Sequence, residues 1–231
     1  MKITKAYGKR SMTSAPGRKI EYIVIHYTAG VTSREGSALN TVAWFNNAAA
    51  VASSDFIVDD TAIVQYNGDI GNVYTWHCGG ARYDNKGGKL YGICTNKNAI
   101  GIEVCSTNST GDMQNANDKT YSFTAATISN AVALTKHLMK KYSIPADHVV
   151  RHYDCTGKLC PGIIGWNAES GSESEWEKFK KRISVSTVET SAPKKYYRVQ
   201  CGAYEKRENA EAQLKELKER VPDKEFFITY S

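Results

Sequence analysis

The sequence predicts an α/β fold with a mixed central β-sheet flanked by helices, followed by a small strand–helix–strand unit at the C-terminal end. Short apolar runs typical of strands alternate with longer segments whose apolar residues recur at helical spacing. A stretch with few large apolar groups, rich in Ser and Thr and containing Pro, then separates the tail from the rest. We therefore expect a main domain over 1–183, a linker over 184–195 and the small unit over 196–231.

Four segments of the main domain have strand patterns. IEYIVIHYT (20–28) alternates and then runs apolar, which indicates a buried strand, and NKNAIGIEVCS (96–106) predicts another central strand. SDFIVDDTAIVQYNG (54–68) holds two short apolar runs around Asp-Asp-Thr, which predicts a hairpin. VVRHY (149–153) predicts a strand that runs out into a loop, where an open site could be built.

Three segments have helical patterns. Residues 37–51 are Ala-rich with apolar residues at helical spacing. The longest predicted helix covers 122–143, with Ser122 as its N-cap, lysines in its last turn and Pro145 just beyond its end. Residues 171–183 place acidic groups first and basic groups last, as a helix dipole favours.

Composition limits the function classes. The 231 residues carry a net charge of +6, which suits an acidic polymer, but the basic residues are scattered and no nucleic-acid motif is found. No apolar run is long enough for a membrane span. The basic N-terminal stretch lacks the apolar core of a secretory signal, so we expect the protein to accumulate in the cytoplasm. The six cysteines form no C-x-x-C pair, which argues against a zinc ribbon, and most are expected to be small buried hydrophobic groups.

Two histidines each end an apolar strand. His26 alone could be a buried structural histidine, but His152 occupies the same kind of position on a second strand. Neutral imidazoles are common ligands of Zn²⁺, and Cys160 in the following loop offers a thiolate. Three protein ligands would leave the fourth position for water, as a catalytic zinc site requires.

Two other residues compete for the third ligand position. Asp154 would lie on the same side of a continuing strand as His152 and could bind the metal or orient a histidine. Cys155 is closer in sequence, but on a strand it would face the opposite way. We prefer Cys160, and Asp154 remains the alternative.

Two charged residues are candidates for the chemistry itself. Glu103 lies in the otherwise apolar run AIGIEV, where a carboxylate is costly unless it is paired, functional or at a solvent-facing edge. Burial would raise its pKa toward the range of a general base. Lys158 would by default be solvated, but between two metal ligands its ammonium could face an oxyanion.

The motifs IVIHYTA, IGIEV, HYDCTGKLCPG and WHCGG together resemble the type 2 N-acetylmuramoyl-L-alanine amidases over about residues 18–183. This family includes phage endolysins and is related to peptidoglycan recognition proteins. The resemblance implies a hydrolase with one Zn²⁺ that cuts the amide between N-acetylmuramic acid and the L-alanine of the stem peptide. It implies these site residues: the zinc ligands His26, His152 and Cys160, the catalytic residues Glu103 and Lys158, and a substrate groove near His77, Tyr27 and Thr28.

One stretch departs from the family pattern. Many members carry Ser-x-His-aromatic after the first helix, whereas this sequence has Ser53-Ser54-Asp55-Phe56. Some members place a catalytic Tyr where Ser54 stands and lack the Glu, so here Glu103 must carry more of the work. Asp55 in place of His leaves the shape of the local groove and the substrate preference open.

The tail resembles the start of a SPOR domain, a peptidoglycan-binding module. YYRVQCGAY (196–204) and EFFITY (225–230) read as strands around a helix at 206–220, which is only one of the two strand–helix units such domains usually hold. We expect a half-domain that binds the wall, packs on the main domain or pairs with a second copy as a dimer. Peptidoglycan and anionic wall polymers are the expected partners, without nucleic acid, and an endolysin would reach the wall only after release from the host cytoplasm.

Two other functions remain open. One is a metal-free Cys-His hydrolase that uses Cys155 or Cys160 as nucleophile with His152. The other is a peptidoglycan-binding module without activity.

Overall fold

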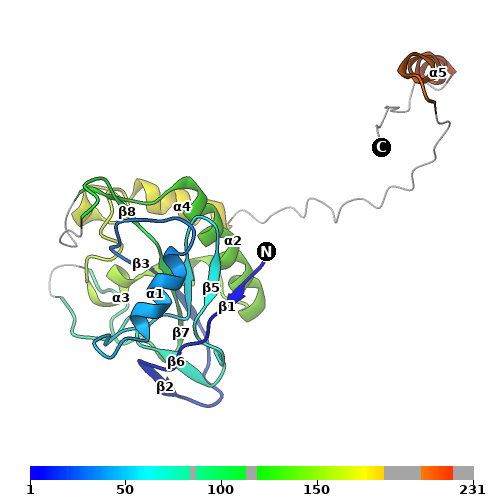
Figure 1. Cartoon of the computed structure of the whole chain (residues 1–231). Helices are drawn as coiled ribbons and strands as arrows, with labels where there is room; N and C mark the ends of the chain where they lie inside the picture. The colour runs from blue at the N-terminus through cyan, green and yellow to red at the C-terminus, as the bar shows by residue number, and fades with distance from the viewer. Residues whose placement is uncertain (84–86, 113–118, 185–203, 221–231) are drawn as a thin grey trace. The chain divides into compact units, whose positions relative to one another are not determined.

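The computed structural model describes residues 1–83, 87–112, 119–184 and 204–220 (Figure 1). The chain divides into two compact units, Met1–Ser186 and Thr187–Ser231, each considered by itself below. Among the described residues, no helix combines the length and the apolar character needed to cross a membrane.

A six-stranded sheet forms the centre of the first unit, and it confirms the predicted α/β class with a mixed sheet. Its strands lie in the order β1 (Thr4–Lys5), β5 (Ile63–Gln65), β4 (Phe56–Val58), β7 (Ala99–Val104), β3 (Tyr22–Tyr27), β10 (Val149–Arg151). β4 and β5 pair antiparallel as the predicted hairpin, while the other neighbours are parallel. The described residues also form two small antiparallel pairs: β2 (Met12–Ser14) with β6 (Val73–Thr75), and β8 (Thr107–Asn108) with β9 (Tyr121–Ser122).

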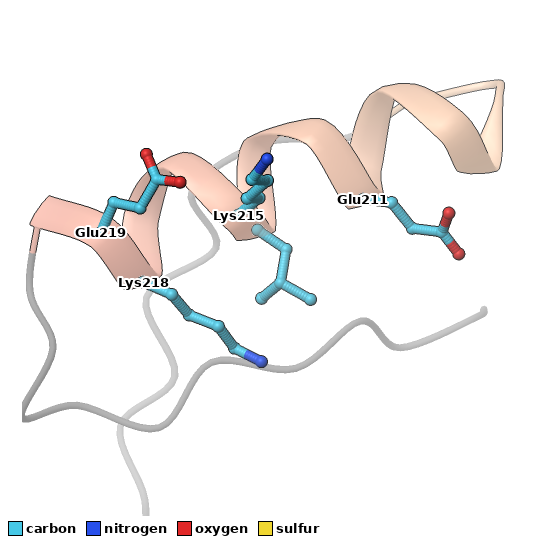
Figure 2. A pocket seen from close by; sticks show the side chains of 5 residues that line it. Glu211, Lys215, Lys218 and Glu219 are labelled. Carbon is cyan, nitrogen blue, oxygen red and sulfur yellow. The ribbon is translucent and has the colours of Figure 1, made fainter.

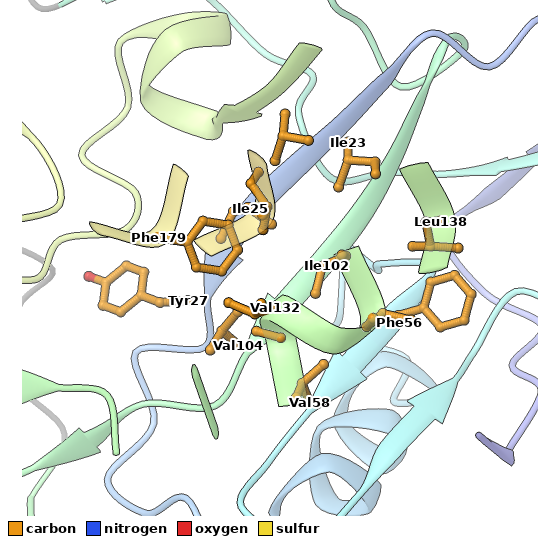
Figure 3. Packing of buried hydrophobic residues seen from close by; sticks show 14 of the residues in the cluster. Ile23, Ile25, Tyr27, Phe56, Val58, Ile102, Val104, Val132, Leu138 and Phe179 are labelled. Carbon is orange, nitrogen blue, oxygen red and sulfur yellow. The ribbon is translucent and has the colours of Figure 1, made fainter. Parts of the chain in front are cut away.

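The main core lies between one face of this sheet and two helices. Ile23, Ile25 and Tyr27 alternate along β3 onto this face, where they meet α2 (Ala125–Tyr142) and α4 (Ser174–Ser184) (Figure 3). Burying this apolar set supplies the main driving force for folding. The intervening residues of β3, including His26, therefore point to the opposite face.

The opposite face is covered in two parts. α1 (Ser37–Phe45) packs its apolar side over β4 and β5. Over β3, β7 and β10 the described cover consists of residues around Cys78, the segment Leu90–Cys94 and the short helix α3 (His152–Thr156). Two single-turn 3₁₀ helices, η1 (Ala146–His148) and η2 (Ala168–Ser170), connect the later elements.

Three predicted boundaries shift for local reasons. α1 stops at Phe45 because Asn46 and Asn47 follow, and these side chains bind backbone N–H groups of the adjoining loops instead. The N-cap of α2 is Thr124, whose hydroxyl accepts from the Thr127 N–H at 3.1 Å, whereas the predicted cap Ser122 ends β9. His152 begins helix α3 and does not continue the strand.

The second unit is described over 204–220, where α5 (Arg207–Arg220) confirms the predicted helix. Both predicted tail strands and the linker lie almost wholly outside the described residues. A shallow hollow along α5 is lined by Glu211, Leu214, Lys215, Lys218 and Glu219 (Figure 2). This lining is mostly charged and includes none of the His, Cys or Glu residues proposed above for chemistry.

Candidate metal centre and active site

The candidate site lies at the carboxyl ends of three parallel strands. His26 and Glu103 are register partners across β3 and β7, and His152 follows the last residue of β10. Open α/β sheets commonly place their ligand sites at this edge. Sheet topology thus brings together residues that are far apart in the sequence.

The two imidazoles and the thiol proposed as ligands lie close together. One ligand atom from each of His26, His152 and Cys160 lies within 4.8 Å of the others, and all three side chains are buried. The Sγ of Cys160 is 3.7 Å from Nδ1 of His26, and the two histidine rings meet edge to face with centroids 4.9 Å apart. The Tyr153 N–H donates to the Cys160 carbonyl at 3.1 Å, which fastens the Cys160 loop to α3.

Asp154, one of the two competing candidates for the third ligand position, is bound within α3 instead. The Asp154 carboxylate pairs with the buried Arg151 guanidinium at 2.9 Å and accepts the Arg151 N–H at 2.9 Å. Arg151 further donates to the Trp166 carbonyl and to Glu173. Asp154 is therefore engaged in holding the start of α3, and it does not join the group of three metal-ligand candidates.

His77 makes a buried contact with the first of these ligands. Its Nδ1 lies 3.1 Å from Nε2 of His26, so Nδ1 of His26 remains free to face Cys160. With Nδ1 as the metal-binding atom, Nε2 of His26 carries the proton and donates it to His77. Partners of this kind fix the tautomer and orientation of a metal-ligating histidine. The sequence placed His77 in the substrate groove and gave no sign of this contact.

Gly101 on β7 makes room for that contact. A Cβ built there would lie 2.7 Å from Cγ of His77 and 2.7 Å from Oγ of Ser54, distances that real side chains do not adopt. The Gly101 N–H also donates to Asp55 at 2.8 Å. This glycine is therefore required by a close approach of side chains across the sheet face.

The protonation states of the two candidate histidine ligands suit a cation, whereas Cys160 would have to give up its proton to bind one. Burial lowers the pKa of His26 well below its usual value and that of His152 to about 3, so both rings are neutral near pH 7. Burial raises the pKa of the Cys160 thiol to about 12. Nε2 of His152 is buried without a hydrogen-bond partner among the described residues. Two neutral imidazoles, one of them with an orphaned nitrogen, and one thiol are a donor set that fits Zn²⁺.

Glu103 and Lys158 flank this group. Glu103 is half-buried, yet its Oε2 is enclosed and has no hydrogen-bond partner among the described residues. Burial raises its pKa to about 8, and the charge of Lys158 opposes that rise. Lys158 is itself exposed, and its charge disfavours protonation of His26 and His152. The site thus combines an enclosed carboxyl with a solvated ammonium within electrostatic reach.

Tyr27 and Thr28, which the family resemblance places near the substrate groove, are held by contacts within the protein. The Tyr27 ring is buried against Tyr121 in the main core, and the Tyr27 backbone N–H binds the Cys160 thiol. The Thr28 hydroxyl accepts the N–H groups of Gly30 and Ser106, both at 3.2 Å. These contacts shape the end of β3.

Asp55 is fully buried inside the protein. Its carboxylate accepts from Asn67, Thr75 and Gly101 at 2.7 to 3.0 Å. Burial raises its pKa, and the Arg18 charge opposes this. The departure from the family pattern at this position therefore lies in the interior, beneath the site.

Comparisons with known proteins agree with this arrangement. The N-acetylmuramoyl-L-alanine amidase family (Amidase_2) matches residues 16–163, and the SPOR domain matches residues 168–229. The SPOR match begins earlier than the tail resemblance predicted, and its first part overlaps η2 and α4, where Trp176 and Phe179 are buried in the core of the first unit.

Individual relatives are consistent with the family match. N-acetylmuramoyl-L-alanine amidase CwlA of Bacillus subtilis (strain 168) is 30% identical over 167 residues, which are 72% of this chain and 50% of that protein. The solved catalytic domain of XlyA is 28% identical with a TM-score of 0.53, covering 79% of this chain and 99% of that one. A mutant endolysin from Bacillus subtilis gives the same identity and TM-score over 79% and 98%.

The chain spans about half the length of the curated relatives it matches. The amidase match alone covers well over half of this chain and includes His26, Glu103 and Cys160. The chain therefore belongs to the N-acetylmuramoyl-L-alanine amidase family.

Proposed function

We propose that this protein is a zinc-dependent peptidoglycan hydrolase that cleaves the amide between N-acetylmuramic acid and the L-alanine of the stem peptide. The observation that carries the proposal is the convergence of His26, His152 and Cys160 beside the enclosed carboxyl of Glu103. Family membership and the names of the amidase relatives support the choice of bond and substrate.

The chain's own residues divide the work. His26, His152 and Cys160 would hold the zinc ion, which supplies Lewis acidity that lowers the pKa of a water and polarises the scissile carbonyl. Oε2 of Glu103 takes the proton from the attacking water and returns it to the leaving L-alanine amine. A pKa of about 8 suits both transfers, and Oε2 has no competing partner among the described residues.

Two further residues act around this exchange. The Lys158 ammonium stabilises the negative charge that develops on the carbonyl oxygen. His77 acts as a positioning residue: with Nδ1 of His26 on the metal, Nε2–H of His26 donates a hydrogen bond to Nδ1 of His77, which keeps Nδ1 of His26 directed at Cys160.

The metal-free Cys-His hydrolase is less well supported. A nucleophilic cysteine needs a lowered pKa, whereas burial raises the pKa of Cys160. The neighbouring His152 is held neutral by burial, so it offers no positive charge to stabilise a thiolate. Loss of activity with a chelator and its return with zinc would separate the two mechanisms.

The test is product analysis on purified peptidoglycan with the full-length protein and zinc. We expect new free L-alanine amino termini and intact glycan strands, and a Glu103→Gln variant that keeps its metal but loses about 10²- to 10⁴-fold in rate. The exposed Asp147→Asn on η1, outside the SPOR match, is the control carboxyl-to-amide change and keeps full activity. Wall binding without new amino termini would instead support a non-catalytic module, and full activity of Glu103→Gln would remove Glu103 from the mechanism.

The SPOR match suggests a second contact with the wall. We propose that residues 168–229 add affinity for peptidoglycan and that the protein acts as a phage or prophage endolysin. Its net charge of +6 would add salt-dependent attraction to anionic wall polymers. Sedimentation with purified walls at increasing salt, with and without the α5 segment, tests both contributions.

A further inference from the structure

Three buried cysteines form a second cluster on the same sheet face as the candidate active site. The Sγ atoms of Cys78, Cys94 and Cys155 all lie within 4.8 Å of one another. All three are free thiols and are at most 3% exposed. They come from three separate segments, so no local sequence motif predicts that they lie together.

The backbone around the cluster is already held in place. The loop that carries Cys94 docks on α3, because Gly88 and Leu90 donate their N–H groups to the carbonyls of Tyr153 and Asp154 at 3.0 and 2.9 Å. The Cys78 N–H donates to the Asn96 side chain at 2.7 Å. The three thiols therefore meet within a framework that does not depend on the sulfur contacts alone.

The spacing is compatible with a shared cation and too long for a disulfide. A Zn–S bond is about 2.3 Å, so two thiolates on one tetrahedral zinc lie about 3.8 Å apart. Sulfurs within 4.8 Å need to move by no more than about an ångström to reach this spacing. A disulfide would instead require two of them to close to about 2.05 Å.

The surroundings select the class of ion. Apolar side chains pack around the cluster, with Val24, Ala99 and Val150 from the sheet beneath it, and the Cys155 thiol donates to the Arg151 carbonyl at 3.5 Å. A donor set made only of thiolates favours soft, thiophilic cations such as Zn²⁺, Cd²⁺ or Cu⁺. Three thiolates and a divalent ion leave one negative charge, and the buried Arg18, which donates to the Ala99 carbonyl, lies within electrostatic reach of Cys78.

We propose that Cys78, Cys94 and Cys155 bind a second thiophilic cation, separate from the one at the active site. Binding converts three thiols to thiolates and releases their protons to solvent. The ion would join the 78–94 loop to α3, one residue from His77 and one helical turn from His152. Its role is structural, because it fastens the two segments that carry residues of the active site.

Metal stoichiometry tests the proposal on the full-length, reduced protein loaded with Zn²⁺. We expect two zinc ions per wild-type chain and one per chain in Cys94→Ala and Cys94→Ser. Cys105→Ala is the matched control, because Cys105 is equally buried but lies in the separate α1 cluster, and it keeps two. A His26→Ala/Cys160→Ala double variant keeps one ion, and adding Cd²⁺ to it produces a thiolate charge-transfer band that the further change Cys94→Ser removes.

The outcomes separate this proposal from the proposed function. One zinc ion in the wild type that persists in both Cys94 variants would overturn the second site and leave the active site intact. Two ions that both persist in the His26→Ala/Cys160→Ala variant would overturn the active-site assignment alone. A mass two hydrogens lower with two fewer titratable thiols would show a disulfide, which also overturns the cation site. Far-ultraviolet circular dichroism confirms that each variant is folded.

Discussion

Nε2 of His26 lies 3.1 Å from Nδ1 of His77, and both rings are buried beneath the edge of the sheet where the candidate ligands meet. The contact sets which nitrogen of His26 faces Cys160. His77, which is not itself a candidate ligand, therefore contacts the candidate metal centre directly.

His77→Ala should weaken zinc binding by about 10- to 100-fold, the usual effect of losing a partner that orients a metal ligand. His77→Gln should retain more affinity, because its amide oxygen can still accept the His26 proton. Competition with a chromophoric chelator measures both affinities. The exposed His137→Ala on α2 is the control, and equal zinc affinity in His77→Ala and wild type would rule out a positioning role.

Gly101→Ala should displace His77, because the new Cβ would lie 2.7 Å from the imidazole ring. We expect a stability loss of about 1 to 3 kcal/mol, typical of overpacking, together with weakened zinc binding. Gly71→Ala is the control, since a Cβ there meets nothing within 4 Å. Urea denaturation and zinc titration of the two variants make the comparison. A Gly101→Ala protein as stable and as tightly bound to zinc as Gly71→Ala would contradict the close approach.

Asp154→Asn should destabilise the protein without removing the active-site ion. The change breaks a buried ion pair with Arg151, for which about 3 to 5 kcal/mol is typical. Denaturant unfolding gives the stability, and elemental analysis gives the metal content. Loss of one ion from a folded Asp154→Asn protein would instead make Asp154 a ligand, as the alternative sequence interpretation allowed.

The stability of the metal-free protein should respond to Glu103 in a defined pH window. Its pKa is raised from 4.5 to about 8 on folding, so the folded state binds the proton more tightly than the unfolded state. The resulting stability is fully present below pH 4.5 and is lost as pH rises through 8. Glu103→Gln lacks this titration, so its stability relative to wild type should increase between these limits. Urea unfolding in chelator at several pH values measures the difference, and a difference that stays constant with pH would show that Glu103 is not enclosed.

The sequence predicted a structural element correctly where one local pattern determines that element. The apolar runs around His26 and Glu103 predicted adjacent central strands, and sheet geometry then brought their ends together. His152 lies beside His26, although it begins a helix and does not continue the predicted strand. The Arg151–Asp154 pair favours a helical turn at that point.

The His77–His26 contact and the cysteine cluster depend on packing between distant segments, which cannot be predicted from any one segment alone. The contact of His77 with His26 depends on space left by Gly101, on a third segment of the chain. The meeting of Cys78, Cys94 and Cys155 depends on the docking of Gly88 and Leu90 on α3. Spacing rules read along the chain, such as C-x-x-C, cannot find ligands assembled in this way.

A zinc-edge anomalous difference map from crystals of the full-length protein tests the central claim most directly. The account predicts a peak at about 2.0 to 2.3 Å from Nδ1 of His26, a ring nitrogen of His152 and Sγ of Cys160. A zinc-loaded crystal with no peak among these three atoms, or with the three too far apart to share one ion, would contradict it.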